Sequence, residues 1–187
     1  NILFIDTVHP SLNLLLLADG WECVDGSTWN KEEILSSIKK FSGVVIRSRF
    51  KIDRQFIDNA SQLKFIARAG AGMENIELEY ALSKKIICLN APEGNRNAVA
   101  EHAMGMLLAL FNRLVIADAE VRAGIWLREE NRGIELEGKI VSIIGFGNTG
   151  STFAKKLSSF NCKILAYDPF IKINSEELGS GDLLHLE

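Results

Sequence analysis

The stretch whose spacing points most directly to chemistry is Gly145-Phe146-Gly147-Asn148-Thr149-Gly150. It has the pattern G-x-G-x-x-G, which in a strand–turn–helix unit brings free backbone N–H groups up to a dinucleotide pyrophosphate. The first glycine makes the tight turn, the second lets the backbone approach the phosphates, and the third lets helix and strand pack closely. The pattern predicts cofactor contacts from Gly145, Gly147, Asn148, Thr149 and Gly150. The alternative is a glycine-rich turn that binds no ligand.

An acidic residue follows at the distance that such a site requires. Asp168 lies 18 residues beyond the last glycine, close to the spacing of about 20 expected for the carboxylate that binds the ribose hydroxyls. Its negative charge would repel a 2′-phosphate, so NAD is the expected cofactor and not NADP.

A second group of residues suits a carboxylate or a phosphate. Arg47 and Arg68 end two neighbouring expected strands, and Arg68 leads directly into Gly70-Ala71-Gly72. Arginines at the carboxyl edge of a parallel sheet bind such anions as planar forks, and successive N–H groups of a glycine-rich turn form an anion nest. A plain tight turn is the equally weighted alternative for the glycine pair alone. With Ser48 beside Arg47, the expected substrate contacts are Arg47, Ser48, Arg68, Gly70, Ala71 and Gly72.

The elements that must position these groups alternate between strand and helix. An apolar strand at 139–144 precedes the glycine run, a helix at 148–160 follows it, and a second strand covers 163–167. Earlier in the chain, the near-continuous apolar runs of the strands predict a parallel α/β sheet covered by helices on both faces. The expected strands are Ile2–Asp6, Trp21–Val24, Gly43–Ser48, Leu63–Arg68 and Ile86–Leu89, with helices at Leu12–Ala18, Lys31–Lys40, Arg54–Ala60 and Ile76–Lys85.

One long helix is expected to separate two domains, at residues 1–96 and 97–187. The pattern predicts a single helix over 97–123, about 40 Å long at about 1.5 Å per residue. Its longest uncharged run, 103–112, is too short for a membrane span, so protein must cover its apolar surface. With Trp126 in the polar loop 124–138, this region is the expected contact of a homodimer.

Composition excludes several classes of protein. A net charge of −3 gives no reason to expect a nucleic-acid partner. Cys23, Cys88 and Cys162 show neither a disulfide framework nor zinc spacing, which favours free thiols, no metal site and a reducing, cytoplasmic compartment. The apolar start of the chain meets Asp6 too soon for a signal peptide and suggests a first strand.

Taken together, these residues resemble the D-2-isomer-specific 2-hydroxyacid dehydrogenases. The resemblance rests on Val45-Ile46-Arg47-Ser48, Arg68 to Asn75, Asn90 to Asn95 with Ala100-Glu101-His102, and Leu136-Glu137-Gly138-Lys139 before the glycine run. It implies a flavodoxin-like substrate domain and an incomplete Rossmann NAD-binding domain, joined by the long helix, with Val99 near the nicotinamide. The implied activity is NAD-dependent oxidation of a D-2-hydroxy acid. The expected substrate is 3-phosphoglycerate, whose oxidation is the first step of serine biosynthesis. Glu74 departs from the aspartate usual at its position.

The resemblance also implies where the chemistry is completed. The family's catalytic arginine, glutamate and histidine lie beyond the second Rossmann strand, and the segment 182–186 resembles a later strand only loosely. None of His9, His102 and His185 is expected to act as the base, so residues 1–187 alone are expected to lack activity and to belong to a longer enzyme. The alternative is an NAD(H)-sensing, corepressor-like binding protein without catalysis.

Overall fold

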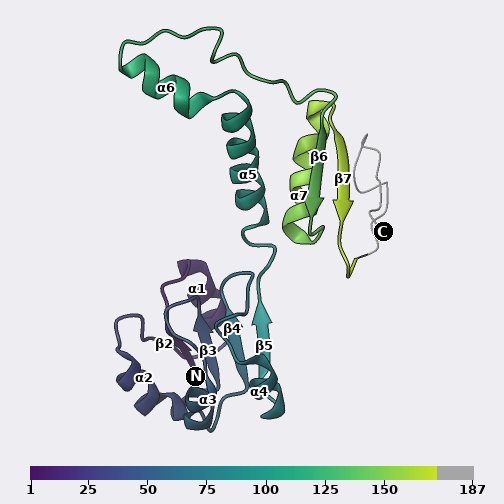
Figure 1. Cartoon of the computed structure of the whole chain (residues 1–187). Helices are drawn as coiled ribbons and strands as arrows, with labels where there is room; N and C mark the ends of the chain where they lie inside the picture. Colours follow the sequence, from purple (N-terminus) through teal and green to yellow (C-terminus); the bar gives the residue numbers. More distant parts are fainter. Residues whose placement is uncertain (172–187) are drawn as a thin grey trace. The chain divides into compact units, whose positions relative to one another are not determined.

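The computed structural model describes residues 1–171 of the 187-residue chain. These residues form two compact units, the first from Asn1 to Gly94 and the second beginning at Asn95 (Figure 1). His185 and the segment 182–186, which the resemblance to the family involves, lie outside the described residues.

The first unit is a five-stranded, wholly parallel sheet. Its strands pair in the order β2-β1-β3-β4-β5, the order of flavodoxin-like folds, which confirms the expected parallel α/β architecture. The strands are β1 (Ile2–Phe4), β2 (Cys23–Asp25), β3 (Gly43–Ile46), β4 (Phe65–Arg68) and β5 (Ile87–Asn90). The helices are α1 (Pro10–Ala18), α2 (Lys31–Ser37) with the 3₁₀ turn η1 (Ile38–Lys40), α3 (Arg54–Asn59) and α4 (Leu78–Ser83).

Strand register divides the apolar side chains between the two faces of this sheet. Leu3, Val44 and Ile66 lie opposite one another on adjacent strands and pack with residues of α2, α3 and α4 into the larger core. The row Phe4, Val45 and Ala67 is displaced by one residue, so it faces the other way and packs with Leu12 and Leu16 of α1. Because successive strand residues alternate between faces, the continuous apolar runs fill both cores.

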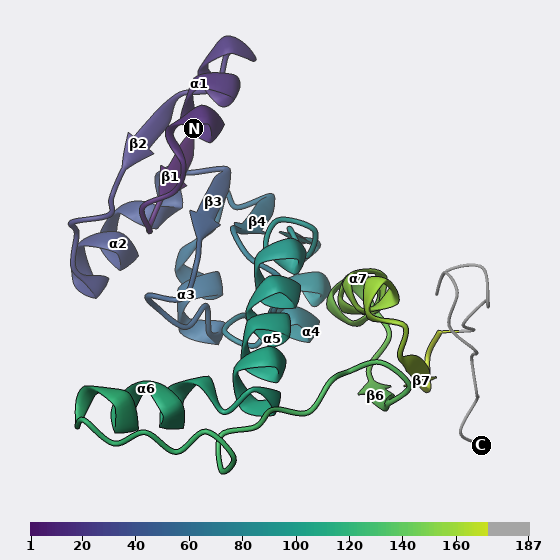
Figure 2. The same cartoon turned by 90° about the horizontal axis from the view of Figure 1, so that it is seen from above.

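The second unit contains the glycine-rich turn. β6 (Ile140–Ile144), α7 (Asn148–Leu157) with η2 (Ser158–Phe160), and β7 (Lys163–Tyr167) form a parallel βαβ unit. Its core is Leu136, Ile143, Phe146, Ala154, Leu157, Cys162, Ile164 and Ala166. The helix α5 (Arg96–Phe111) adds Met104, Leu107, Leu108 and Phe111 to this core. It packs against α7 (Figure 2). Glu101 of α5 pairs there with Lys156 of α7 at 3.1 Å.

The expectation of one helix over 97–123 is wrong. α5 ends at Phe111, and α6 (Leu114–Arg122) starts after a break that bends the pair by 59°. Arg113 at the break has φ 50°, a left-handed conformation that does not continue a helix. The carbonyl of Phe111 accepts a hydrogen bond from Ile134 N–H at 3.0 Å instead of one from the next helical turn. The returning segment therefore caps α5 where the composition alone suggested continuation.

No single helix among residues 1–171 has the length and apolar content needed to cross a membrane. Within the described part of the chain, the bent pair of α5 and α6 meets those two criteria when both helices are taken together. The three cysteines are free, and burial raises the pKa of each thiol.

Candidate active site

Two of the three glycines in the turn between β6 and α7 must lack a side chain for geometric reasons, and the third borders open space. Gly145 has φ +90°, a conformation that L side chains rarely adopt. A Cβ on Gly150 would overlap the carbonyl oxygen of Gly145, so helix and turn could not approach as they do. A Cβ on Gly147 would meet nothing within 4 Å. The space outside Gly147 is therefore open, and the residues fit a bound pyrophosphate.

The N-terminus of α7 offers unpaired hydrogen-bond donors beside that space. Gly147 is the N-cap and no side chain caps the helix. The first amide of the helix with a backbone partner is that of Ser151, which donates to Gly147 O at 3.0 Å. Within residues 1–171, the N–H groups of Asn148, Thr149 and Gly150 thus have no protein acceptor. Such donors and the positive end of the helix dipole favour an anion.

Asp168 lies directly against the glycine-rich turn. Its Oδ2 accepts from Phe146 N–H at 2.7 Å and its Oδ1 from Phe170 N–H at 2.9 Å. The Phe170 and Phe146 amides hold the pKa of this half-buried carboxyl below its ordinary value. Each oxygen keeps lone pairs for further donors. An ionised carboxylate is therefore fixed at the end of β7, where ribose hydroxyls would need it.

Val99 belongs to the same unit as this turn. It lies in the first turn of α5 and is 42% exposed. Figure 1 shows the start of α5 at the same end of the unit as the turn between β6 and α7. The position is compatible with a contact to a bound cofactor, which stays a prediction.

The expected substrate residues gather at the carboxyl ends of β3 and β4 in the first unit. Ile46 and Arg68 are paired neighbours, so Arg47 and Ser48 leave the sheet beside the Gly70–Gly72 turn. Arg47 is exposed, and its guanidinium forms no hydrogen bond or ion pair among the described residues. It is therefore a free cation at the ligand side of the sheet.

Arg68, in contrast, is committed to the protein. Its side chain is 15% exposed, donates from Nε to Arg47 O at 3.1 Å, and lies 3.8 Å from the Glu74 carboxylate. A Cβ on Gly70 would overlap the Arg68 guanidinium, and one on Gly72 would overlap the Glu74 carboxylate. The two glycines thus make room for the chain's own charged side chains.

The Gly70–Gly72 turn keeps the free amides on which the expected anion nest depends. Neither glycine has a positive φ, so a nest here would be of the turn type and not the type that alternates right- and left-handed residues. The N–H groups of Ala71 and Gly72 have no acceptor among residues 1–171 and can receive an anion, so the nest stays a prediction.

Two residues at this edge escaped the sequence reasoning. Asp6, at the end of β1, accepts from three backbone N–H groups of the loop after β3. Arg49 lies two residues beyond Arg47, and its guanidinium donates to carbonyls of Ile5, Gly26, Ser27 and Trp29. The only local signal was a charged residue just after each apolar strand; the partners lie 20 to 44 residues away.

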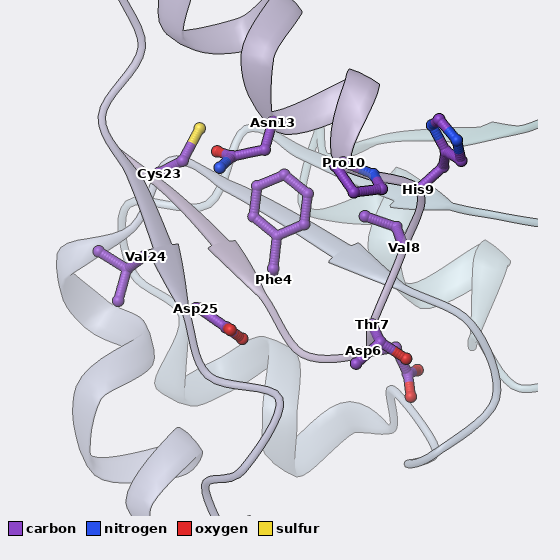
Figure 3. Close-up of a pocket in the computed structure, with 10 residues that line it drawn as sticks. All are labelled: Phe4, Asp6, Thr7, Val8, His9, Pro10, Asn13, Cys23, Val24 and Asp25. Atoms are coloured by element: carbon purple, nitrogen blue, oxygen red, sulfur yellow. The ribbon is translucent and has the colours of Figure 1, made fainter.

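A cavity of about 280 Å³ opens at the carboxyl ends of β1 and β2. Figure 3 shows Phe4 in its middle, Asp6 and Thr7 together at one end, and His9 and Pro10 at the start of α1. None of the expected substrate residues lines it. His9 caps α1 by accepting from Ser11 N–H, and His102 is exposed on α5. Among the described residues, no group of His, Cys, Asp or Glu could hold a metal ion.

Comparison with known proteins adds a family to this geometry. Residues 2–177 match the family described as D-isomer specific 2-hydroxyacid dehydrogenase, catalytic domain. The D-3-phosphoglycerate dehydrogenase of Archaeoglobus fulgidus is 39% identical over 151 residues, which are 80% of this chain and 29% of that enzyme. That of Methanocaldococcus jannaschii is 38% identical over 179 residues, 95% of this chain and 34% of that enzyme. The chain therefore spans roughly a third of the length of these relatives.

A solved structure supports the assignment at the level of fold. The crystal structure of D-lactate dehydrogenase from Aquifex aeolicus, complexed with NAD and lactic acid, covers 100% of this chain with a TM-score of 0.81 and 23% identity. The chain covers 56% of that protein. With the family match over nearly the whole sequence, the chain belongs to the D-isomer specific 2-hydroxyacid dehydrogenase family.

Proposed function

We propose that the chain carries the substrate-binding domain and the first part of a Rossmann NAD-binding domain of an NAD-dependent enzyme that oxidises a D-2-hydroxy acid. The observation that carries the proposal is the turn between β6 and α7, with open space outside Gly147 and unpaired N–H groups at the start of α7. An ionised Asp168 beside the turn suits ribose hydroxyls and disfavours a 2′-phosphate.

The residues of the chain bind and orient the two reactants. When bound, NAD accepts a hydride from the substrate carbon. The α7 N-terminus would hold its pyrophosphate, Asp168 its adenosine ribose, and Val99 would lie beside the nicotinamide. In the first unit, Arg47 would pair with the substrate carboxylate or phosphate, and the free amides of Ala71 and Gly72, with Ser48, would add hydrogen bonds. Arg68 would support this surface by its hydrogen bond to the Arg47 carbonyl, and Gly70 leaves space for the Arg68 guanidinium.

We favour 3-phosphoglycerate as the substrate. The two relatives with the highest identities given above are both D-3-phosphoglycerate dehydrogenases, and a free arginine suits a phosphorylated acid. The decisive experiment is a panel with the full-length protein, in which NADH formation is followed with 3-phosphoglycerate, D-lactate and D-glycerate. A kcat/KM for 3-phosphoglycerate at least about tenfold above the others supports the choice, since one charge-assisted contact is worth about that factor. NAD binding without turnover of any acid would instead favour a sensor.

We further propose that the enzyme is a homodimer that uses the α5–α6 region and the segment 124–138. This region exposes Met106, Leu110, Leu114, Val115, Ile116, Val121, Ile125, Trp126 and Leu127. A groove of about 290 Å³ at the bend and another of about 170 Å³ beside Trp126 give it relief for a partner. Exposed apolar patches of this kind mark interaction surfaces. Sedimentation equilibrium of wild type and Trp126→Ala tests the proposal, and a monomeric wild type would refute it.

A further inference from the structure

The backbone that carries Arg47 is held by one carboxylate from another strand. Asp6 follows β1, and its Oδ2 accepts from the N–H groups of Arg47 at 2.6 Å, Ser48 at 3.2 Å and Arg49 at 3.3 Å. These are consecutive residues after β3, so the loop winds around a single oxygen atom. Charge-assisted hydrogen bonds of this type are stronger than those between neutral groups.

The other side of the Arg47 backbone is held as well. Its carbonyl accepts from Arg68 Nε and from Asn75 Nδ2, both at 3.1 Å. Asn75 Nδ2 also donates to Phe50 O at 3.3 Å, farther along the same loop. Both polar backbone groups of Arg47 are therefore fixed by side chains from three separate segments. What remains free is the Arg47 side chain itself.

The strand order explains why this loop needs such support. β1 and β3 are neighbours in the sheet, but the chain leaves β1 toward α1, which packs on one face, and leaves β3 toward α3, which packs on the other. The loops diverge at this switch point, where ligands bind to parallel sheets. Beyond the ladder, Asp6 replaces the missing strand-to-strand bonds. Figure 3 shows Asp6 at the end of β1, at the edge of the cavity.

The charged side chains at this loop differ in whether they have partners within the protein. Arg49 is bound to backbone carbonyls and stacks over Phe50, with its guanidinium 4.7 Å from the ring centre. Asp6 Oδ2 accepts from three backbone amides, and the carboxylate forms no ion pair among the described residues. The Arg47 guanidinium is therefore unpaired among the described residues, because Asp6 bonds to the backbone N–H of Arg47 and not to its side chain.

The geometry points to Asp6 as a positioning residue for the substrate: it fixes the 47–49 backbone so that the Arg47 guanidinium is presented to the anionic group of the 2-hydroxy acid. The inference rests on the proposed function, because it assigns Asp6 a role in that same substrate site. Fixing three residues before the ligand arrives removes an ordering cost that binding would otherwise bear. Substitution of Asp6 must then weaken substrate binding and leave NAD binding unchanged.

The test uses the full-length protein and three variants. Asp6→Ala removes the acceptor, and Asp6→Asn keeps an acceptor oxygen without the charge. Asp53→Ala is the matched control, because Asp53 accepts one backbone N–H, that of Phe56 at 2.9 Å, and caps α3 in the same unit. Calorimetry measures the affinity for 3-phosphoglycerate and for NAD, and thermal unfolding gives the Tm of each variant.

Asp6→Ala is expected to weaken 3-phosphoglycerate binding about tenfold or more, the effect of about one charge-assisted contact, with NAD affinity unchanged. The substrate KM should rise by a similar factor. Asp6→Asn should recover part of the loss, and it serves alone if the alanine variant does not fold. Asp53→Ala should lower Tm without changing the substrate Kd. Equal losses for substrate and NAD, or a substrate loss in Asp53→Ala as large as in Asp6→Ala, would overturn the assignment.

A second readout separates this inference from the proposed function. NMR relaxation of the Ser48 and Arg49 amides reports loop order without any ligand. Both amides should become more mobile in Asp6→Ala and stay unchanged in Asp53→Ala, whereas unchanged amides in Asp6→Ala would overturn the inference. A wild type that binds none of the hydroxy acids refutes the proposed function, and the relaxation data then decide the role of Asp6 in the loop alone.

Discussion

Gly147→Ala should weaken NAD binding while leaving the fold nearly intact. The added Cβ meets no atom within 4 Å, and the backbone of Gly147 is extended with a negative φ of −72°, so it is not in the left-handed region that favours glycine. Alanine is a poorer N-cap than glycine by about 0.5 kcal/mol, so Tm should fall only slightly. The methyl group would instead fill space that a pyrophosphate needs.

The loss of affinity follows from the contacts that the methyl group would displace. Each charge-assisted hydrogen bond from the α7 N-terminus to a phosphate contributes about 1.5–3 kcal/mol. Moving the phosphate away from one of them raises the Kd of NAD roughly ten- to a hundredfold. Calorimetric titration of NAD into wild type and variant, with Tm measured on the same samples, provides both numbers.

Gly150→Ala is the matched comparison. Its Cβ would overlap the Gly145 carbonyl oxygen, which belongs to the backbone and has little room to move. Overpacking of this kind costs about 1–3 kcal/mol, so this variant should lose stability and NAD affinity together. The reasoning fails if Gly147→Ala binds NAD as wild type does, or if the two variants lose equal stability.

Four further outcomes are expected. Arg47→Ala should lower the affinity for 3-phosphoglycerate by about ten- to a hundredfold and leave the affinity for NAD unchanged. Equal losses of both affinities would place Arg47 outside the substrate site. Asp168→Ala should narrow the preference for NAD over NADP in parallel titrations, which a wild type that uses both equally would contradict. Because its pKa is depressed in the fold, Asp168 contributes stability that is lost as pH falls below about 4, so Asp168→Asn should flatten the acid limb of a Tm-versus-pH curve. Lys85 lies just after α4 with a left-handed φ of 62°. The variant Lys85→Gly should therefore raise the free energy of unfolding by about 0.5–1 kcal/mol, measured by urea unfolding. Lys84→Gly is the control and should lower it.

The sheet of the first unit could be predicted from the sequence because the signal for each strand lies within the strand itself. Runs such as Ile2-Leu3-Phe4 and Val44-Val45-Ile46 are buried on both faces of the sheet, and a strand buried on both faces is apolar at every position. The turn between β6 and α7 was predictable for a similar reason: glycine, strand and helix signals lie within a few residues of one another.

The break between α5 and α6 could not be predicted in this way. Composition around Asn112 and Arg113 still favours a helix, and the capping bond to Phe111 O comes from Ile134, 23 residues later. The roles of Asp6 and Arg49 were hidden for the same reason. Both residues form hydrogen bonds with backbone groups of segments far away in the sequence. The local sequence pattern does not show which distant loop will lie next to a given side chain.

The two glycine pairs show what a third glycine in register adds. Gly70 and Gly72 have the same G-x-G spacing as Gly145 and Gly147. Around the first pair, the missing side chains leave room that Arg68 and Glu74 fill. Outside Gly147 the room stays open. Gly150 makes the difference, because its lack of a Cβ lets α7 approach the turn so that the N-terminal amides face the opening. A G-x-G pair alone therefore reports close packing, whereas the triplet on a helix start reports a surface left free for an anion.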